Sequence, residues 1–256
     1  MPPEAPDGKL AGQACVITGA TSGIGLATAR LFRAHGARLA IMARDHQAVD
    51  AAAAELGPHA VAVTGDVARV ADLTVLMRAA NDAYGGIDVV VANAGIGRFA
   101  PLEAVTEDDF DALLAVHLRG TFFTVQAALP YLRPGAAVVL ISSAGAQRGF
   151  PATSVYNAVK AGVRSLGRTF AAELAPRGIR VNTVSPGLTE TPMVTGDPGL
   201  PPEHRDEAAR QQLALIPLRR LGRPEEIATT ILFLASDDAS FYTGADLTPD
   251  GGTRDI

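Results

Sequence analysis

Several features that would define a class of protein are scarce in this sequence. Cys15 is the only cysteine in 256 residues, so no disulfide can form within the chain. It lies in an apolar run, which favours an inert buried thiol over a nucleophile. No stretch approaches the ~20 apolar residues that span a bilayer, and residues 1–8 lack the basic start and apolar stretch of a signal peptide. We therefore expect a cytoplasmic protein with no membrane partner.

Charge is scarce as well. Charged residues make up 19% of the chain, the net charge is −5, and no run of lysine or arginine is present, so no nucleic-acid partner is expected. The hydrophobic fraction of 48% is enough for a large buried core. No Pro/Gly/Ser-rich linker divides the chain, which predicts one domain over 9–256 after a disordered, proline-rich tail at 1–8. No metal site is predicted.

The sequence does contain a regular alternation of strand-like and helix-like segments. Runs such as Val89–Val91 and Val138–Ile141 are apolar on both faces, as in a parallel sheet that helices cover on both sides. The pattern predicts a single-domain α/β protein with a doubly wound (Rossmann) fold, in which helices flank a mostly parallel, seven-stranded sheet. The expected strands lie at about 14–18, 38–42, 60–64, 87–92, 136–142, 179–185 and 245–248, and the expected helices at about 24–35, 46–56, 69–84, 107–129, 153–174 and 224–236.

A glycine-rich loop, Thr18-Gly-Ala-Thr-Ser-Gly-Ile-Gly25, follows the first expected strand. Its glycines allow a tight turn and the close approach of a ligand, and the next helix points free N–H groups and its positive end at a phosphate. The alternative is a tight turn without a ligand. A second glycine motif, Gly95–Ala100, precedes Pro101 and a loop rather than a helix, so we do not interpret it as a pyrophosphate site.

Tyr156 and Lys160 lie four residues apart, on one face of an expected helix. A neighbouring ammonium group favours the phenolate of a tyrosine, whose pKa is ordinarily about 10, and so makes proton removal from an alcohol plausible near neutrality. Alone, the spacing is weak, because any surface helix can carry such a pair by chance. Ser143 stands thirteen residues before the tyrosine.

Taken in order, these motifs resemble the short-chain dehydrogenase/reductase family. The resemblance implies an oxidoreductase that transfers a hydride between a nicotinamide cofactor and a ketone or secondary alcohol, assembled as a homotetramer or homodimer. Its markers follow one another between about Lys9 and Gly252: the glycine loop, Asp66-Val67, Asn93-Ala94-Gly95, Ser143, Tyr156-x-x-x-Lys160, Pro186-Gly187 and a tail with Thr243-Gly244 and Asp250-Gly-Gly.

The resemblance also implies catalytic roles. Ser143 would hold the substrate oxygen, Tyr156 would exchange the proton, and Lys160 would lower the pKa of Tyr156 and bind the cofactor ribose. Ser142 is expected to face the sheet, by strand alternation. His117 departs from the family, which has at this position an asparagine that binds a water in a proton relay. Three alternatives stay open: a neutral imidazole that keeps the relay, a charged one that opposes Lys160, and a packed core histidine.

The end of the second strand decides between the two nicotinamide cofactors. Ala43 occupies the position where the family's NAD-binding members have an acidic residue, and the next residue, Arg44, suits a 2′-phosphate. NADP(H) is therefore favoured and NAD(H) stays possible, while Asp45 could pair with Arg44 or repel the phosphate. Asp66 could instead be a helix cap near Arg69. The other cofactor contacts implied by the resemblance are Gly19, Thr21, Ser22, Gly23, Ile24, Gly25, Asp66, Val67, Asn93, Ala94, Gly95, Tyr156, Lys160, Pro186, Gly187, Thr189 and Thr191.

The segment 188–222 breaks the alternation. It is rich in proline and carries one short helical stretch, Glu203–Ala214. Loops of this length are usually functional or disordered, and the resemblance makes this one a lid over the substrate; the alternative is a solvent-exposed excursion. With the loop at 144–153 it would line a pocket for an apolar or aromatic ketone, or for an acyl chain with an acidic end. A dinucleotide-binding sensor without turnover is the remaining functional alternative.

Overall fold

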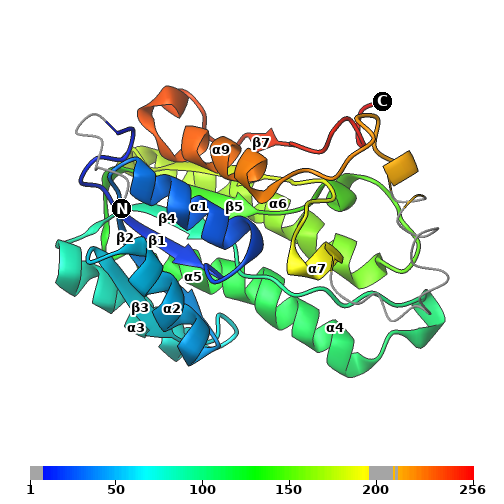
Figure 1. Cartoon of the computed structure of the whole chain (residues 1–256), viewed down its shortest axis with the longest axis horizontal. Coiled ribbons are helices and arrows are strands. Elements are labelled where there is room, and N and C mark those ends of the chain that lie inside the picture. The colour runs from blue at the N-terminus through cyan, green and yellow to red at the C-terminus, as the bar shows by residue number, and fades with distance from the viewer. Residues whose placement is uncertain (1–7, 196–209, 211–212) are drawn as a thin grey trace.

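A parallel sheet between two layers of helices forms the centre of the computed structural model, which describes residues 8–195, 210 and 213–256 (Figure 1). The strand order is β3-β2-β1-β4-β5-β6-β7, and all neighbouring strands are parallel. This confirms the predicted doubly wound α/β fold. The strands are β1 (Ala14–Thr18), β2 (Arg38–Ala43), β3 (Ala60–Thr64), β4 (Ile87–Ala92), β5 (Leu132–Ile141), β6 (Arg180–Val184) and β7 (Asp246–Leu247).

Side-chain alternation along the strands divides the core into two layers. In β1, Cys15 and Ile17 pack into the layer that contains α1 (Gly23–Ala34), α2 (His46–Leu56) and α9 (Pro224–Ala235). Val16 points the other way, into the layer of α3 (Val70–Tyr84), α5 (Gly120–Ala128) and α6 (Ser154–Leu174). Both faces are therefore buried, which explains why the strands are apolar throughout. Burial also raises the pKa of the Cys15 thiol well above its ordinary value, as the interpretation of an inert cysteine requires.

The helix predicted over 107–129 is interrupted. It consists of α4 (Glu107–Leu113), a π-helical segment η2 (Leu114–Arg119) and α5. Within the π-helical segment the hydrogen-bond register widens locally, and such segments occur often at functional sites. The continuous apolar pattern did not reveal this break. It matters because His117 lies inside η2.

Strand β5 begins four residues earlier than predicted. Ile87 pairs with Leu132, and the register between β4 and β5 then shifts before Val89 pairs with Ala137. The polar and turn-forming residues between them, including Gly135 with φ of 84°, break the apolar pattern. The start of the strand was therefore hidden from the sequence argument.

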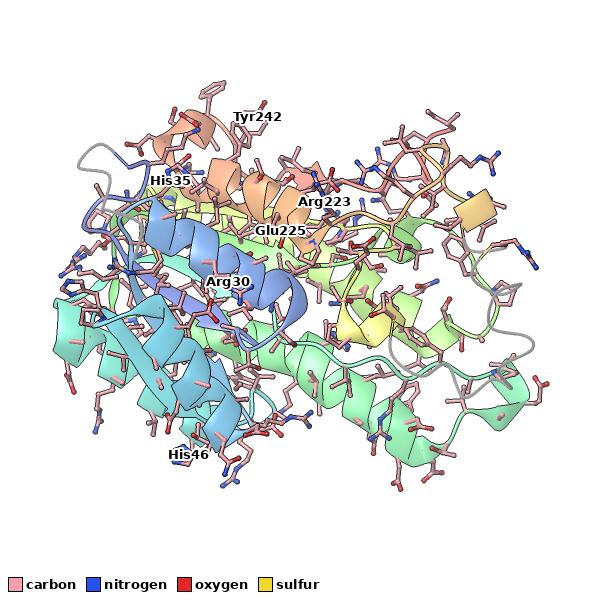
Figure 2. All side chains as sticks on the ribbon, viewed as in Figure 1. Arg30, His35, His46, Arg223, Glu225 and Tyr242 are labelled. Carbon is pink, nitrogen blue, oxygen red and sulfur yellow. The ribbon has the colours of Figure 1, made fainter. Side chains whose placement is uncertain are left out.

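Helix ends follow the local chemistry of the chain. Thr106 caps α4 by accepting a hydrogen bond from Asp109 N at 3.1 Å, and Gly57 ends α2 with φ of 91°. The outer helix faces carry the charges, as Arg30 on α1 does (Figure 2). Arg30 forms an exposed ion pair with Glu55 on α2. Such surface pairs contribute little stability.

Short single-turn segments complete the described fold and border the site. They are η1 (Leu102–Ala104), η3 (Ala144–Gln147), η4 (Ala175–Arg177), α7 (Pro192–Thr195) and η5 (Asp237–Ala239). Among the described residues, none of the helices has the length and apolarity needed to span a bilayer. Of the predicted tail at 1–8, only Gly8 is described, and most of the predicted helical stretch Glu203–Ala214 also lies outside the described residues.

The strand order reverses between β1 and β4, which places a ligand crevice at their carboxyl ends. The loops after β1, β4, β5 and β6 open at this edge of the sheet, and they carry the motifs singled out in the sequence.

Candidate active site

The glycine loop after β1 is packed so closely that side chains are excluded at two positions. Gly19 has φ of 68°, in the left-handed region. A Cβ atom on Gly25 would lie 2.1 Å from the carbonyl oxygen of Gly19. Glycine at position 25 thus lets the first turn of α1 rest directly on the loop.

The start of α1 has the properties of a phosphate site. Ser22 is the N-cap residue, yet its side chain makes no capping hydrogen bond, and no acidic residue lies in the first turn. The N–H groups and the positive end of the helix thus face the crevice without a competing anion. Thr191 lies over this turn, since its Cγ2 would be 3.0 Å from a Cβ atom on Gly23. The residues present therefore fit a dinucleotide pyrophosphate.

Asn93 braces the glycine loop from the neighbouring strand. Its Nδ2 atom donates to the carbonyl oxygens of Thr18 and Gly19, both at 3.0 Å. The backbone N–H groups of Asn93 and Ala94 each donate to Thr18 Oγ1 at 3.1 Å. These four bonds tie the ends of β1 and β4 together. Asn93, expected beside the ribose, thus also braces the glycine loop, a role that no sequence motif indicates.

Asp66 and Arg44 lie toward the β2–β3 side of the crevice. The Asp66 carboxylate accepts a hydrogen bond from Ala68 N at 2.9 Å, within the turn before α3, and Arg69 rather than Asp66 is the N-cap residue of that helix. Arg44 is exposed just after β2. Its neighbour Asp45 caps α2 by accepting from Ala48 N at 3.0 Å.

Two serines follow β5, and they point in different directions. Ser142 is buried and donates to the backbone oxygen of Lys160 at 2.8 Å, which agrees with its predicted structural role. Ser143 is the N-cap residue of η3, and its Oγ atom accepts a hydrogen bond from Gly145 N at 3.2 Å. The Ala144 N–H donates to Pro186 O at 2.9 Å, so the Ser143 turn also rests on the loop after β6.

The loop after β6 also has internal contacts. Thr189 donates to Gly187 O at 3.0 Å and bridges to Gly222, which joins the two ends of the predicted lid segment. Val67, from the β3 side, lies against Gly120 at the start of α5.

Tyr156 and Lys160 lie on the first turns of α6, next to Ser143. Burial raises the pKa of Tyr156, and a hydrogen bond with Ser143 lowers it in part. Lys160 is 4% exposed, donates from Nζ to Ile141 O at 2.9 Å and lies 5.8 Å from the centre of the Tyr156 ring. Burial lowers the pKa of the Lys160 ammonium to about 7.

These pKa directions correct one expectation. The charge of Lys160 was expected to lower the pKa of Tyr156. In this structure the net direction is upward, because desolvation outweighs the opposing effect of Ser143.

His117 is 1% exposed and is held by the loop after β4. Its Nε2 atom lies 2.8 Å from Ile96 O, and the ring packs edge-on against Tyr156 with the two ring centres 5.5 Å apart. Burial, and then the nearby charge of Lys160, lowers the pKa of His117 to about 3. This lowered pKa favours a neutral imidazole at ordinary pH over the charged alternative. Its Nδ1 atom has no hydrogen-bond partner among the described residues.

Phe99 is a site residue that the sequence argument did not single out. Its ring packs edge-on against Tyr156, with ring centres 5.3 Å apart, and it is 52% exposed. The loop that carries it is joined to the loop before α6 by the bond from Ala100 N to Ala152 O at 3.0 Å. Its position within the rejected glycine motif was the only available signal.

A dinucleotide-binding α/β fold with this set of residues at its switch point matches known enzymes along almost its entire length. The family model described as enoyl-(acyl carrier protein) reductase matches residues 19–254. The 3-oxoacyl-[acyl-carrier-protein] reductase of Thermotoga maritima is 41% identical over 249 residues, which cover 95% of this chain and 98% of that protein.

Two solved structures from Brucella melitensis give the same result. A short-chain dehydrogenase/reductase described as glucose/ribitol dehydrogenase superposes with a TM-score of 0.89 at 35% identity, over 96% of this chain and 98% of the other. A 3-ketoacyl-(acyl-carrier-protein) reductase complexed with NADH superposes with a TM-score of 0.88 at 33% identity, over 96% and 99%. The chain belongs to the short-chain dehydrogenase/reductase family and is an NAD(P)-dependent oxidoreductase.

Proposed function

We propose that this enzyme is an NADP(H)-linked carbonyl reductase, or secondary-alcohol dehydrogenase in the reverse direction, with Tyr156 as its acid and base. The observation that carries the proposal is the meeting of Ser143, Tyr156 and Lys160 at the carboxyl edge of the sheet. Together they supply a hydroxyl, a phenol and a buried ammonium group at the edge of the sheet that also carries the glycine loop.

Each residue has a distinct task in this proposal. The Ser143 hydroxyl donates a hydrogen bond to the substrate oxygen. Tyr156 gives its phenolic proton to that oxygen during reduction and takes it back during oxidation. The raised pKa of Tyr156 keeps the phenol protonated near neutrality, which suits the role of an acid in reduction. The bound nicotinamide supplies the hydride.

Lys160 is anchored by Ile141 O, and it retains two further N–H donors for the ribose hydroxyls of the cofactor. A ligand oxygen at this position also favours the charged form of the ammonium group, against the effect of burial on its pKa. The remaining predicted contacts are kept as proposals: the pyrophosphate on residues 19–25 with Thr191 and Thr189, the adenine on Asp66 and Val67, the ribose and nicotinamide beside Asn93, Ala94 and Gly95, and the carboxamide on Pro186 and Gly187.

The substrate proposed here is an apolar or aromatic ketone. Phe99 and Met193, both partly exposed, meet over Gly97 at the entrance. Because two relatives are named as 3-oxoacyl-carrier-protein reductases, a 3-oxoacyl thioester belongs in the same test. The lid at 188–222 and the dimer or tetramer remain predictions.

A panel of ketones, 3-oxoacyl thioesters and secondary alcohols, each assayed with NADPH and with NADH, tests this function. We expect turnover of at least one carbonyl compound, with NADPH preferred. Tight cofactor binding without any turnover across the panel would instead support the sensor alternative.

We propose that His117 holds the loop after β4 against Tyr156 and stays neutral throughout turnover. The variant His117→Asn should keep the pH–rate profile of the wild type above about pH 4, because the imidazole is already neutral there. The exposed His46→Asn variant controls for a general change in charge. A limb of the profile that moves between about pH 5 and 7 only in His117→Asn would mean that His117 titrates during turnover.

A further inference from the structure

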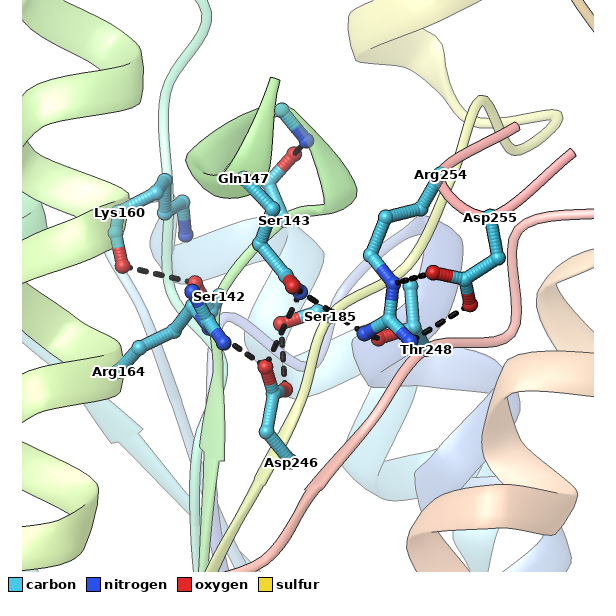
Figure 3. Close-up of polar contacts among 11 residues, drawn as sticks. Ser142, Ser143, Gln147, Lys160, Arg164, Ser185, Asp246, Thr248, Arg254 and Asp255 are labelled. Atoms are coloured by element: carbon cyan, nitrogen blue, oxygen red, sulfur yellow. Dashed lines mark hydrogen bonds and ion pairs between the residues drawn. The ribbon is translucent and has the colours of Figure 1, made fainter. Parts of the chain in front are cut away.

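Gln147 ends the single-turn segment η3, which Ser143 begins. Two groups from the C-terminal part of the chain hold its amide (Figure 3). The Nε2 atom donates to Asp246 Oδ2 at 3.2 Å, and the Oε1 atom accepts from Arg254 Nη1 at 3.2 Å. Both hydrogen-bonding ends of the amide are used, so its orientation is fixed from two sides.

Asp246 joins three elements around this amide. Besides Gln147, its carboxylate accepts from Ser185 Oγ at 2.6 Å, just after β6, and from Arg164 Nε at 2.5 Å, on α6. Arg164 lies one helical turn beyond Lys160, and the side chains of the ion pair are 23% and 16% exposed. The ion pair is mostly buried, and breaking it would leave a poorly solvated charge, so Asp246 is held firmly in place.

Arg254 is itself fixed by its surroundings. Its guanidinium donates to Thr248 Oγ1 at 2.9 Å, and its backbone N–H donates to Asp250 Oδ2 at 2.8 Å. Arg254 also forms an ion pair with Asp255, whose side chain is 64% exposed, and a surface pair of this kind adds little to its position. Arg148, the next residue of the loop at 144–153, is also held by the C-terminal part of the chain, since its Nη1 atom donates to Thr253 O at 2.9 Å.

We propose that Gln147 is a positioning residue for Ser143. Residues 246–254, which we call the clasp, hold Gln147 and so fix the position of the Ser143 turn relative to Tyr156. The turn is so short that a displacement at Gln147 carries through to Ser143. Asp246 links Gln147 to Arg164 on α6, the helix that also carries Tyr156 and Lys160. The clasp rests on the proposed function in one respect: the Ser143–Tyr156 contact is what it aligns for catalysis.

The variant Gln147→Met keeps the length of the side chain and removes both hydrogen bonds. We expect kcat for carbonyl reduction to fall about tenfold, as befits a displaced catalytic group, with the cofactor dissociation constant changed less than about twofold. The matched control is Asp255→Ala, which removes the exposed ion pair of Arg254 but leaves its bond to Gln147. It should keep the kcat of the wild type. A loss of thermal stability with unchanged kcat in the folded fraction would reduce Gln147 to a structural residue.

A second measurement needs no turnover. An ultraviolet titration, with the matching Tyr156→Phe protein subtracted, reports the ionisation of Tyr156 alone. Because the Ser143 contact lowers the pKa of Tyr156, Gln147→Met should shift that ionisation to higher pH, and Asp255→Ala should not. An unshifted titration in Gln147→Met overturns the clasp. A shifted titration in a chain that turns over no carbonyl compound overturns the proposed function and leaves the clasp standing.

Discussion

Replacing Tyr156 by phenylalanine is expected to lower kcat/KM for carbonyl reduction by at least about 100-fold, the range that a positioned acid contributes. Phenylalanine keeps the ring, so the edge-on contacts with Phe99 and His117 survive. What disappears is the proton that passes to the substrate oxygen, together with the hydrogen bond to Ser143. The loss should therefore lie mainly in kcat, because the interaction strengthens in the transition state.

Steady-state kinetics with NADPH and the best ketone of the panel measure this effect. Tyr242→Phe is the matched control, because Tyr242 is 41% exposed beside Phe233 and lies in the loop before β7. It should leave both kinetic constants unchanged. Cofactor binding, followed by NADPH fluorescence, should be nearly equal in all three proteins. Full activity in Tyr156→Phe would assign the proton to another group and refute the proposed mechanism.

The fold could be predicted because its information is local and repeated. Each strand is an apolar run with a helix after it, and both sides of β1 are buried in separate layers. The prediction was wrong where the local sequence pattern does not reflect the backbone conformation, as in the predicted helix at 107–129. The π-helical segment at Leu114–Arg119 has the same apolar character as the helices around it, so nothing in the composition marks the wider register.

The candidate site could be assembled from the sequence for a topological reason. Parallel strands end at one edge of the sheet, so motifs that follow successive strands lie close together there. Side-chain contacts between residues far apart in the sequence could not be predicted in this way. Gln147 and Asp246 are 99 residues apart, and neither belongs to a motif. The direction of the Tyr156 pKa was also missed, since it depends on how deeply the phenol is desolvated.

Arg44→Ala should lower kcat/KM with NADPH by about 10- to 100-fold, the equivalent of one charge-assisted hydrogen bond to a phosphate. The value with NADH should change by no more than a few-fold. Arg44 follows β2 at the edge where the adenosine end of the cofactor is expected, and it is exposed. The neighbouring Asp45 caps α2 by accepting from Ala48 N through one of its two carboxylate oxygens. We therefore expect a 2′-phosphate to contact the guanidinium of Arg44 directly.

The control for Arg44→Ala is Arg78→Ala, which removes an equal charge from an exposed position on α3. Because net charge alone steers anions to the surface, a purely long-range effect would lower the NADPH value equally in both variants and would vanish at high salt. A direct phosphate contact is specific to Arg44 and survives salt in part. Equal losses with NADPH and NADH in Arg44→Ala would mean that Arg44 serves the shared part of the cofactor. A wild type that prefers NADH would instead place the enzyme among the NAD-dependent dehydrogenases of its family, despite the missing acidic residue at Ala43.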